Sequence, residues 1–414
     1  MPVKKFSQIG ISIFLLGMLA FQAQAAFTSL YIFGDGLSTT TNNTSGLSYY
    51  YGKRYTNGRI WAEVLAQRLG LGANSLTNPN WSNANNDWAY YGQYSFNLMT
   101  NINHFAPKDG PTALFIVWVN NADFVNDMST IYPSTNNAAW NNAIAQSLNN
   151  HWSIINNLYA RGARTIILPN AVDITEIPVY AGLKVSQPAV RNFIRQEIIS
   201  FNNQYAGLLK QAQATLPGLN IYEPDYFGLL DNVLTNASAY GLTNALYNGI
   251  STYAVGSGNS MTNVNGPGTN YIFWDQMDPS AKLHEIMGDL AVQMVAPVQF
   301  SQMAVLSDST QATCTNRLDI LNMPVGLNGF VDGTTNLGQA DFAWTTVTNI
   351  SSTSPNQSVF VNSPWLPPVL TPGGKGSITG FGGASGPSTA DPMPVSPGWI
   401  QAYRLRFPYA WNWP

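Results

Sequence analysis

The chain has 414 residues and a formal net charge of −3; 45 % of its residues are hydrophobic and only 9 % are charged. This length suggests two or three domains, and the apolar share is enough for a sizeable core. The scarcity of Lys and Arg argues against a nucleic-acid partner and against a polybasic membrane-surface protein. The single cysteine, Cys314, excludes an internal disulfide and a cysteine-based zinc site.

Residues 1–25 have the pattern of a secretory signal peptide. Two lysines precede a short apolar run, Ile9–Phe21, and Ala23-Gln24-Ala25 fits the small-x-small cleavage rule. The run is too short to favour a membrane-spanning helix, and we expect no transmembrane segment later in the chain. We therefore predict cleavage near Ala25 and a secreted, periplasmic or cell-surface protein. An exported chain without paired cysteines suits a bacterial setting.

Strand-like and helix-like segments alternate between residues 26 and 303. Apolar runs of strand length lie at 30–33, 114–119, 165–168 and 219–222, and helical patterns lie at 59–69, 138–160, 186–208 and 280–294. Buried runs that alternate with amphipathic helices are typical of a parallel sheet covered by helices on both faces. In such sheets, ligands bind at the carboxyl ends of the strands.

The pattern changes after about residue 300, where the helical stripes disappear. Segments 344–350, 358–361 and 402–405 look like strands, and 371–398 is rich in Gly, Pro and Ser, as expected of a long loop. We predict a small β-sandwich-like domain over residues 304–414. Its aromatic tail predicts a last strand that closes the core, or alternatively a carbohydrate or surface contact (Phe407, Tyr409, Trp411 and Trp413).

Five segments share a pattern with one known family. Phe33-Gly34-Asp35-Gly36-Leu37-Ser38 follows the first predicted strand, and the others come in order at Trp88–Gly92, Leu114–Phe124, Leu168–Asn170 and Phe273–Pro279. Together they resemble the sequence blocks of the GDSL, or SGNH, hydrolases, which are secreted esterases, lipases and carbohydrate deacetylases. The resemblance implies a flavodoxin-like three-layer α/β/α domain with a parallel sheet over residues 26–303. It implies no cofactor and no resident metal.

Three of the four residues that name the family are absent. The position of the nucleophilic serine is Gly36, that of the oxyanion-hole asparagine is Ala122, and that of the general-base histidine is Asp278. The oxyanion glycine is present as Gly92, and so is the supporting aspartate, Asp275. Ser-His-Asp catalysis needs a hydroxyl, an imidazole and oxyanion donors. Loss of the whole triad costs a serine protease about 10⁶-fold in rate.

Other residues offer only weak replacements for the missing groups. Ser38 lies two residues after Gly36, and we expect its hydroxyl to cap the helix that follows the loop. His284 lies on the last predicted helix, where we expect a structural role. His104 and His151 are isolated in the sequence, and we assign neither to catalysis.

Four aspartates should approach the same carboxyl edge of the sheet: Asp35, Asp123, Asp275 and Asp278. Close carboxylates raise one another's pKa, so one could act as a base and another as an acid. Such a group could also hold a hard cation such as Ca²⁺. We favour a simpler interpretation: Asp35 and Asp123 cap backbone groups in their loops, and Asp275 and Asp278 cap the last helix.

Amide and aromatic side chains also gather near the predicted cleft. This mixture suits the hydroxyls and faces of a sugar, and it equally suits a charge-poor protein that covers its surface with amides. The residues are Asn85, Asn86, Asn120, Asn121, Trp81, Trp88, Tyr90, Tyr91 and Trp118.

The sequence therefore predicts a secreted, non-hydrolytic member of the GDSL family that binds a small-molecule, acyl or carbohydrate ligand. One alternative is an active hydrolase of ester bonds that works through Asp275 and Asp278, or through Ser38. Another is a surface or glycan-binding protein that works through its C-terminal β domain. The candidate ligand-binding residues are Asp35, Ser38, Tyr91, Asn120 and Asn121.

Overall fold

The computed structural model describes residues 27–40, 54–71, 86–242, 270–306, 313–334, 344–364 and 402–407. Several predictions fall outside these residues: the signal peptide, the Gly/Pro-rich stretch 371–398, and the tail beyond Phe407. Trp81 and Asn85 also lie outside them. Among the described residues, no helix has the length and apolar character needed to cross a membrane.

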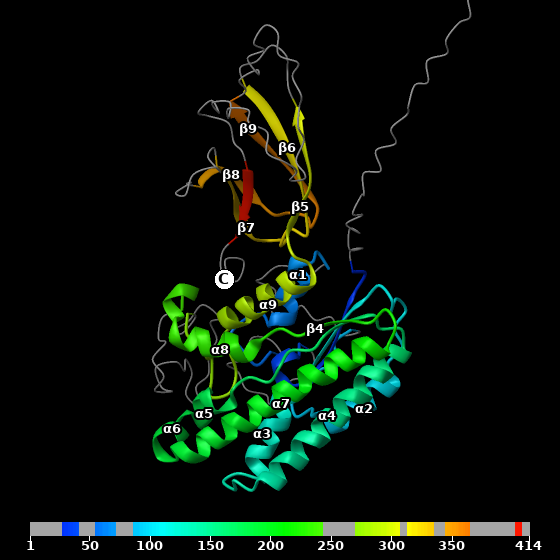
Figure 1. Cartoon of the computed structure of the whole chain (residues 1–414), viewed down its shortest axis with the longest axis vertical. Coiled ribbons are helices and arrows are strands. Elements are labelled where there is room, and N and C mark those ends of the chain that lie inside the picture. Colours follow the sequence, from blue (N-terminus) through cyan, green and yellow to red (C-terminus); the bar gives the residue numbers. More distant parts are fainter. Residues whose placement is uncertain are drawn as a thin grey trace, which may run out of the picture.

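A parallel sheet forms the centre of the first domain (Figure 1). Its strands are β1 (Leu30–Gly34), β2 (Leu114–Trp118), β3 (Thr165–Ile167) and β4 (Asn220–Tyr222), in that spatial order. An extended segment at 86–90 runs along the other edge of β1, where Trp88 N–H donates to the Ile32 carbonyl at 2.8 Å. Every residue of β1 and β2 is buried, as expected for strands covered on both faces.

Helices cover both faces of this sheet, which confirms the predicted three-layer α/β/α fold. In Figure 1, α1 and α9 lie on one side, and α2, α4 and α7 lie on the other. The α-helices are α1 (Trp61–Arg68), α2 (Ser95–His104), α3 (Asn120–Thr130), α4 (Asn137–Ala160), α5 (Pro178–Ala181), α6 (Leu183–Ser186), α7 (Pro188–Thr215), α8 (Tyr226–Thr235) and α9 (Ala281–Val295). Short 3₁₀ turns form η1 (Gly36–Ser38), η2 (Ile174–Glu176) and η3 (Ala237–Tyr240).

The long helices follow directly from their apolar spacing. The α7 helix buries Ile194, Ile198, Phe201, Tyr205 and Leu209, which recur every three or four residues along one face. The helix predicted to open at Ser186 begins at Pro188 as α7, and Ser186 is instead the last residue of α6. Proline suits the first helical turn because it has no N–H to leave unpaired.

The C-terminal region contains two antiparallel three-stranded sheets. Its strands are β5 (Gln299–Leu306), β6 (Thr313–Leu321), β7 (Asn328–Thr334), β8 (Thr345–Ser351), β9 (Gln357–Pro364) and β10 (Ala402–Arg406). The sheet orders are β5-β6-β9 and β10-β7-β8. A separate small core lies between them and includes Leu318, Val331, Ile350 and Phe407. We call this region the β module.

Arg68, the last residue of α1, connects the two domains. Its guanidinium donates to Asp289 of α9 at 2.7 Å and to Glu285 at 3.1 Å. A third bond reaches the Val325 carbonyl of the β module at 3.3 Å, and Val325 N–H donates back to the Arg68 carbonyl at 3.1 Å. Arg68 and Asp289 are both buried, so each charge depends on the other for compensation.

We predict that Arg68→Ala lowers the free energy of unfolding by about 3–5 kcal/mol, because Asp289 then stays buried without its partner. Chemical denaturation of the full chain measures this loss. Arg317→Ala is the matched control, since Arg317 pairs with Asp319 at the surface of the β module. We expect it to cost less than about 1 kcal/mol. Equal losses in the two variants would contradict the role of Arg68.

Candidate functional site

The site begins where β1 ends. Asp35 follows the strand, and its carboxylate caps η1 by accepting the Leu37 N–H at 2.9 Å. Its own N–H donates to the Trp118 carbonyl at 3.2 Å, so Asp35 lies between the carboxyl ends of β1 and β2. Burial raises the pKa of Asp35 to about 7, and the nearby charge of Asp123 adds to this effect. The nearby backbone N–H groups of Leu37 and Ala122 oppose this rise in pKa.

Gly36 has space for the side chain that it lacks. A Cβ built at this position would lie 3.5 Å from Tyr91 Cδ2 and 3.6 Å from Tyr55 Cδ2, which are ordinary van der Waals distances. The rings of Tyr55 and Tyr91 stack with their centroids 5.2 Å apart, and 59 % of Tyr91 is exposed. Gly92, next in the chain, has a φ of +79°, a conformation that favours glycine. A serine at position 36 would therefore face this open side of the loop.

Ser38 is placed differently from the expectation that it caps a helix. Its hydroxyl is fully buried and accepts the Trp61 indole N–H at 3.3 Å. The N-cap of α1 is Ile60, so the predicted capping role of Ser38 is wrong. Because the hydroxyl is packed under η1, a substrate has no direct access to it.

Asp275 and Asp278 form a carboxyl pair. The Asp275 carboxylate accepts the N–H groups of Met277 at 2.8 Å and Asp278 at 2.7 Å, which closes a tight turn. The Asp275 carboxyl group also acts on that of Asp278 and favours its protonated form. Burial raises the pKa of Asp278 well above its ordinary value, and the charges of Asp275 and Asp35 raise it further.

The expectation that Asp275 and Asp278 cap the last helix is wrong. Ser280 is the N-cap of α9, and its hydroxyl accepts the Leu283 N–H at 3.3 Å. The two carboxyl groups instead hold the turn before the helix. This turn brings Asp278 near enough to Asp35 for the charge of Asp35 to act on it.

Asp123 lies apart from the three other aspartates. Its carboxylate accepts the Ser95 N–H at 2.9 Å and the Ser147 hydroxyl at 2.5 Å. It thus joins α3 to α2 and α4. The predicted group of four aspartates is therefore a group of three with a fourth carboxylate behind it. Among the described residues, no group of three or more His, Cys, Asp or Glu side chains has the geometry to hold a metal ion.

Asn120 and Asn121 hold the loop that follows β3. Asn120 Nδ2 donates to the Pro169 carbonyl at 2.8 Å, and Asn121 Oδ1 accepts the Val172 N–H at 2.9 Å. Both side chains are buried. These two predicted ligand-binding residues therefore position a loop, and the loop in turn supplies side chains to a pocket.

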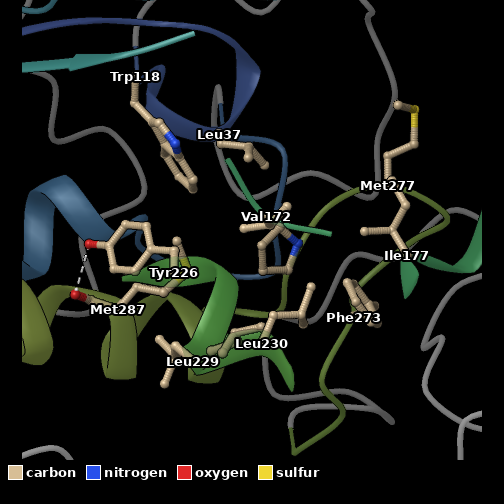
Figure 2. A pocket seen from close by; sticks show the side chains of 12 residues that line it. Leu37, Trp118, Val172, Ile177, Tyr226, Leu229, Leu230, Phe273, Met277 and Met287 are labelled. Carbon is tan, nitrogen blue, oxygen red and sulfur yellow. Dashed lines mark hydrogen bonds between the residues drawn. The ribbon is translucent and has the colours of Figure 1, made fainter. Parts of the chain in front are cut away.

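A small apolar pocket lies against this loop (Figure 2). It has about 40 Å³ of room for the centre of a water-sized sphere, within about 410 Å³ of unfilled space that includes its open mouth. Leu37 follows Gly36, and Met277 and Pro279 flank Asp278, so the pocket lies beside the carboxyl groups. Tyr226 turns its polar end away, because its hydroxyl donates to the Met287 carbonyl at 3.0 Å. The lining residues are Leu37, Trp118, Val172, Ile177, Tyr226, Leu229, Leu230, Phe273, Met277, Pro279, Leu283 and Met287.

Apart from Trp118, the sequence analysis assigned none of the lining residues to a ligand site, although Leu37, Phe273, Met277 and Pro279 lie in the family's sequence blocks. The α8 helix buries four residues at spacings of three, one and three: Tyr226, Leu229, Leu230 and Val233. This is the signal of an amphipathic helix, which the prediction above does not place there. Of the predicted aromatic set, Trp118 lines the pocket and Trp88 stacks on Phe33.

The three histidines are engaged elsewhere. His284 is buried, and its Nδ1 accepts the Trp61 N–H at the start of α1 at 3.2 Å; burial lowers its pKa to about 3. His151 Nδ1 donates to the Ser147 carbonyl at 2.8 Å, and burial lowers its pKa as well. His104 is exposed at the end of α2 and bonds the Thr100 carbonyl at 2.7 Å.

A parallel sheet whose first two strands end in polar loops, with an apolar pocket beside them, defines an α/β protein of the SGNH-hydrolase class. The GDSL-like lipase/acylhydrolase family matches residues 30–291 of the chain. The chain therefore belongs to this family.

Individual relatives are distant. A phosphatidylcholine-sterol acyltransferase of Aeromonas hydrophila is 27 % identical over 257 residues, which cover 55 % of this chain and 71 % of the relative. A GDSL esterase/lipase of Arabidopsis thaliana is 21 % identical over 331 residues, which cover 66 % of this chain and 90 % of the relative. The crystal structure of a lipase from a goat rumen metagenome aligns with a TM-score of 0.38 at 10 % identity, over 64 % of this chain and 97 % of that structure.

We predict that Asp278→Asn stabilises the folded protein at neutral pH. A raised pKa in the folded state means that the acid stabilises the fold below about pH 4, and that this stabilisation is lost as the pH rises through the folded pKa. Asparagine keeps a donor for Asp275 and never ionises. The free energy of unfolding should therefore exceed that of the native chain by about 1–3 kcal/mol at pH 8 and by nearly nothing at pH 4.

Denaturant titrations at several pH values measure this difference. Asp319→Asn, in the exposed pair with Arg317, is the control and should change stability without this pH trend. If the free energies of unfolding of Asp278→Asn and the native chain differ by the same amount at every pH, the raised pKa of Asp278 is contradicted.

Proposed function

We propose that this chain is a secreted, non-hydrolytic member of its family that binds an acyl ligand in the apolar pocket beside the former catalytic site. One observation carries the proposal: the nucleophile position is Gly36, which lies beside a pocket lined almost entirely by apolar side chains. Ser38 is buried and cannot replace the missing hydroxyl. Without a nucleophile, the pocket keeps its shape and loses the bond-breaking step.

The chemistry of the lining favours an acyl chain over a sugar. Sugar sites need polar side chains that meet hydroxyl groups, whereas Leu229, Leu230 and Phe273 offer only apolar surface. Burial of a methylene group contributes about 0.8 kcal/mol, so several carbons of a chain give measurable affinity. The relatives described above, an acyltransferase and an esterase/lipase, support the same choice. The predicted signal peptide supports a location outside the cytoplasm.

A second candidate function rests on the carboxyl pair. Asp275 raises the pKa of Asp278, and the pKa of Asp35 is raised to about 7. A protonated carboxyl group could protonate a leaving alcohol while an ionised one activates water. Against this, the developing oxyanion would form among acidic groups, and the family's amide donor is replaced by Ala122.

We predict that the mature native chain does not hydrolyse short acyl esters, and that Gly36→Ser/Ala122→Asn/Asp278→His does. The space around Gly36 admits the serine side chain, and Asp275 remains to orient the new histidine. The matched control is Gly36→Ala/Ala122→Asn/Asp278→His, which lacks only the hydroxyl. Release of a chromogenic alcohol should be at least about 10²-fold faster with serine than with alanine.

Turnover by the native chain that disappears in Asp275→Ala would support the carboxyl-pair hydrolase and remove the binding-only proposal. Equal rates for the serine and alanine triple variants would show that the cleft does not place an ester at position 36.

We predict that Val172→Trp abolishes acyl binding by filling the pocket. Val172 lines the pocket, and the indole would occupy the space of the acyl chain. Val185→Trp is the matched control, because Val185 is 87 % exposed on α6. A fluorescent acyl ester should bind at least about tenfold more weakly to Val172→Trp, a difference of about 1.4 kcal/mol, and equally well to the control and the native chain. Unchanged binding in Val172→Trp would place the ligand elsewhere.

A further inference from the structure

Arg59 is a buried cation whose hydrogen bonds are incomplete. Only 4 % of the residue is exposed, and its Nη2 donates to the neutral amide of Gln67 at 2.5 Å. Its Nε and Nη1 have no hydrogen-bond partner within the described part of the chain. Buried donors are normally paired, and a guanidinium without a counter-charge carries a large desolvation cost.

The nearby carboxylates are engaged by other arginines. Glu63 receives a bidentate pair from Arg54, at 2.7 and 2.5 Å, and also accepts the Ile60 N–H. Glu285 and Asp289 both bond Arg68. The charges of Glu63 and Glu285 act on Arg59, yet neither carboxylate bonds it; burial lowers the pKa of Arg59 to about 10.

The rest of the sequence offers few other carboxylates. Of the 21 Asp and Glu residues, only Asp308, Asp341 and Asp391 lie outside the described residues. The stretches 41–53 and 72–85, which flank this segment in the chain, contain no acidic residue. Among the described residues no carboxylate bonds Arg59, which leaves its unpaired donors open to a neutral group or a free anion.

We propose that Arg59 holds a halide-sized anion at the contact between α1 and the β module. The Nε and Nη1 donors lie on different edges of the guanidinium, so one anion meets one of them. A monatomic anion needs the least space at either edge. The chemical class of the ligand is a monovalent inorganic anion, with chloride as the probe.

The position of this anion gives it a structural role. Gln67 accepts a hydrogen bond from Arg59 and also packs closely against Gly326 of the β module. A Cβ added to Gly326 would lie only 2.7 Å from Gln67 Nε2. Arg68, the next residue, carries the bond to Val325. An anion on Arg59 would therefore stabilise the end of α1 on which the β module rests. This inference is independent of the proposed acyl ligand.

The test is the melting temperature of the full chain as chloride replaces methanesulfonate at constant ionic strength. We expect a saturable rise of about 2–4 °C for the native chain. Arg164→Gln is the matched control, because Arg164 packs over the Tyr159 ring away from this cluster; it should keep the rise. Arg59→Gln should lose it.

The same rise in Arg59→Gln, or no rise in the native chain, would overturn the proposal and assign water to the site. If Arg59→Gln does not fold, chloride NMR on the native chain decides. Excess broadening of the chloride resonance that disappears when bromide is added supports the site. The absence of this broadening overturns the proposal. Acyl binding is measured separately in the same samples. A failure of the anion proposal can therefore be told apart from a failure of the acyl-binding proposal.

Discussion

The crowding of carboxyl groups at one edge of the sheet is the constraint on which the site depends. Asp275 and Asp35 both raise the pKa of Asp278, so the protonated form of Asp278 is favoured beside them. The family's arrangement places a histidine where Asp278 stands. The turn does not depend on that side chain, because the Asp275 carboxylate accepts the backbone N–H groups of Met277 and Asp278.

The few other charges of this chain are placed where loops must be fixed. Asp173 is buried in the loop after β3 and is bonded by Arg191 and Arg195 of α7. That loop also carries Val172 and Ile177, which form one wall of the pocket. Breaking a buried pair costs several kcal/mol, whereas an exposed pair contributes little. The pocket is therefore shaped by a few ion pairs and amide contacts outside it.

The fold was predictable because its signals are local. Continuous apolar runs identify β1 and β2, and the stripe of α7 repeats every three or four residues. The pocket was not predictable, because its walls come from segments far apart in the chain, such as Leu37 and Leu230. The partners of Asn121 and Asp123 are equally distant in sequence: Val172 and Ser147 lie 51 and 24 residues away. Spacing within one element carries no information about such contacts.

The family's catalytic positions and the pocket are held by separate contacts. The loop that carries Gly36 is fixed by Asp35, which caps η1 through its own carboxylate. The pocket walls depend on Asn121, Asp173 and the turn of Asp275, and none of these contacts involves the side chain at position 36 or 278. The residues at these two positions can therefore change while the pocket keeps its walls.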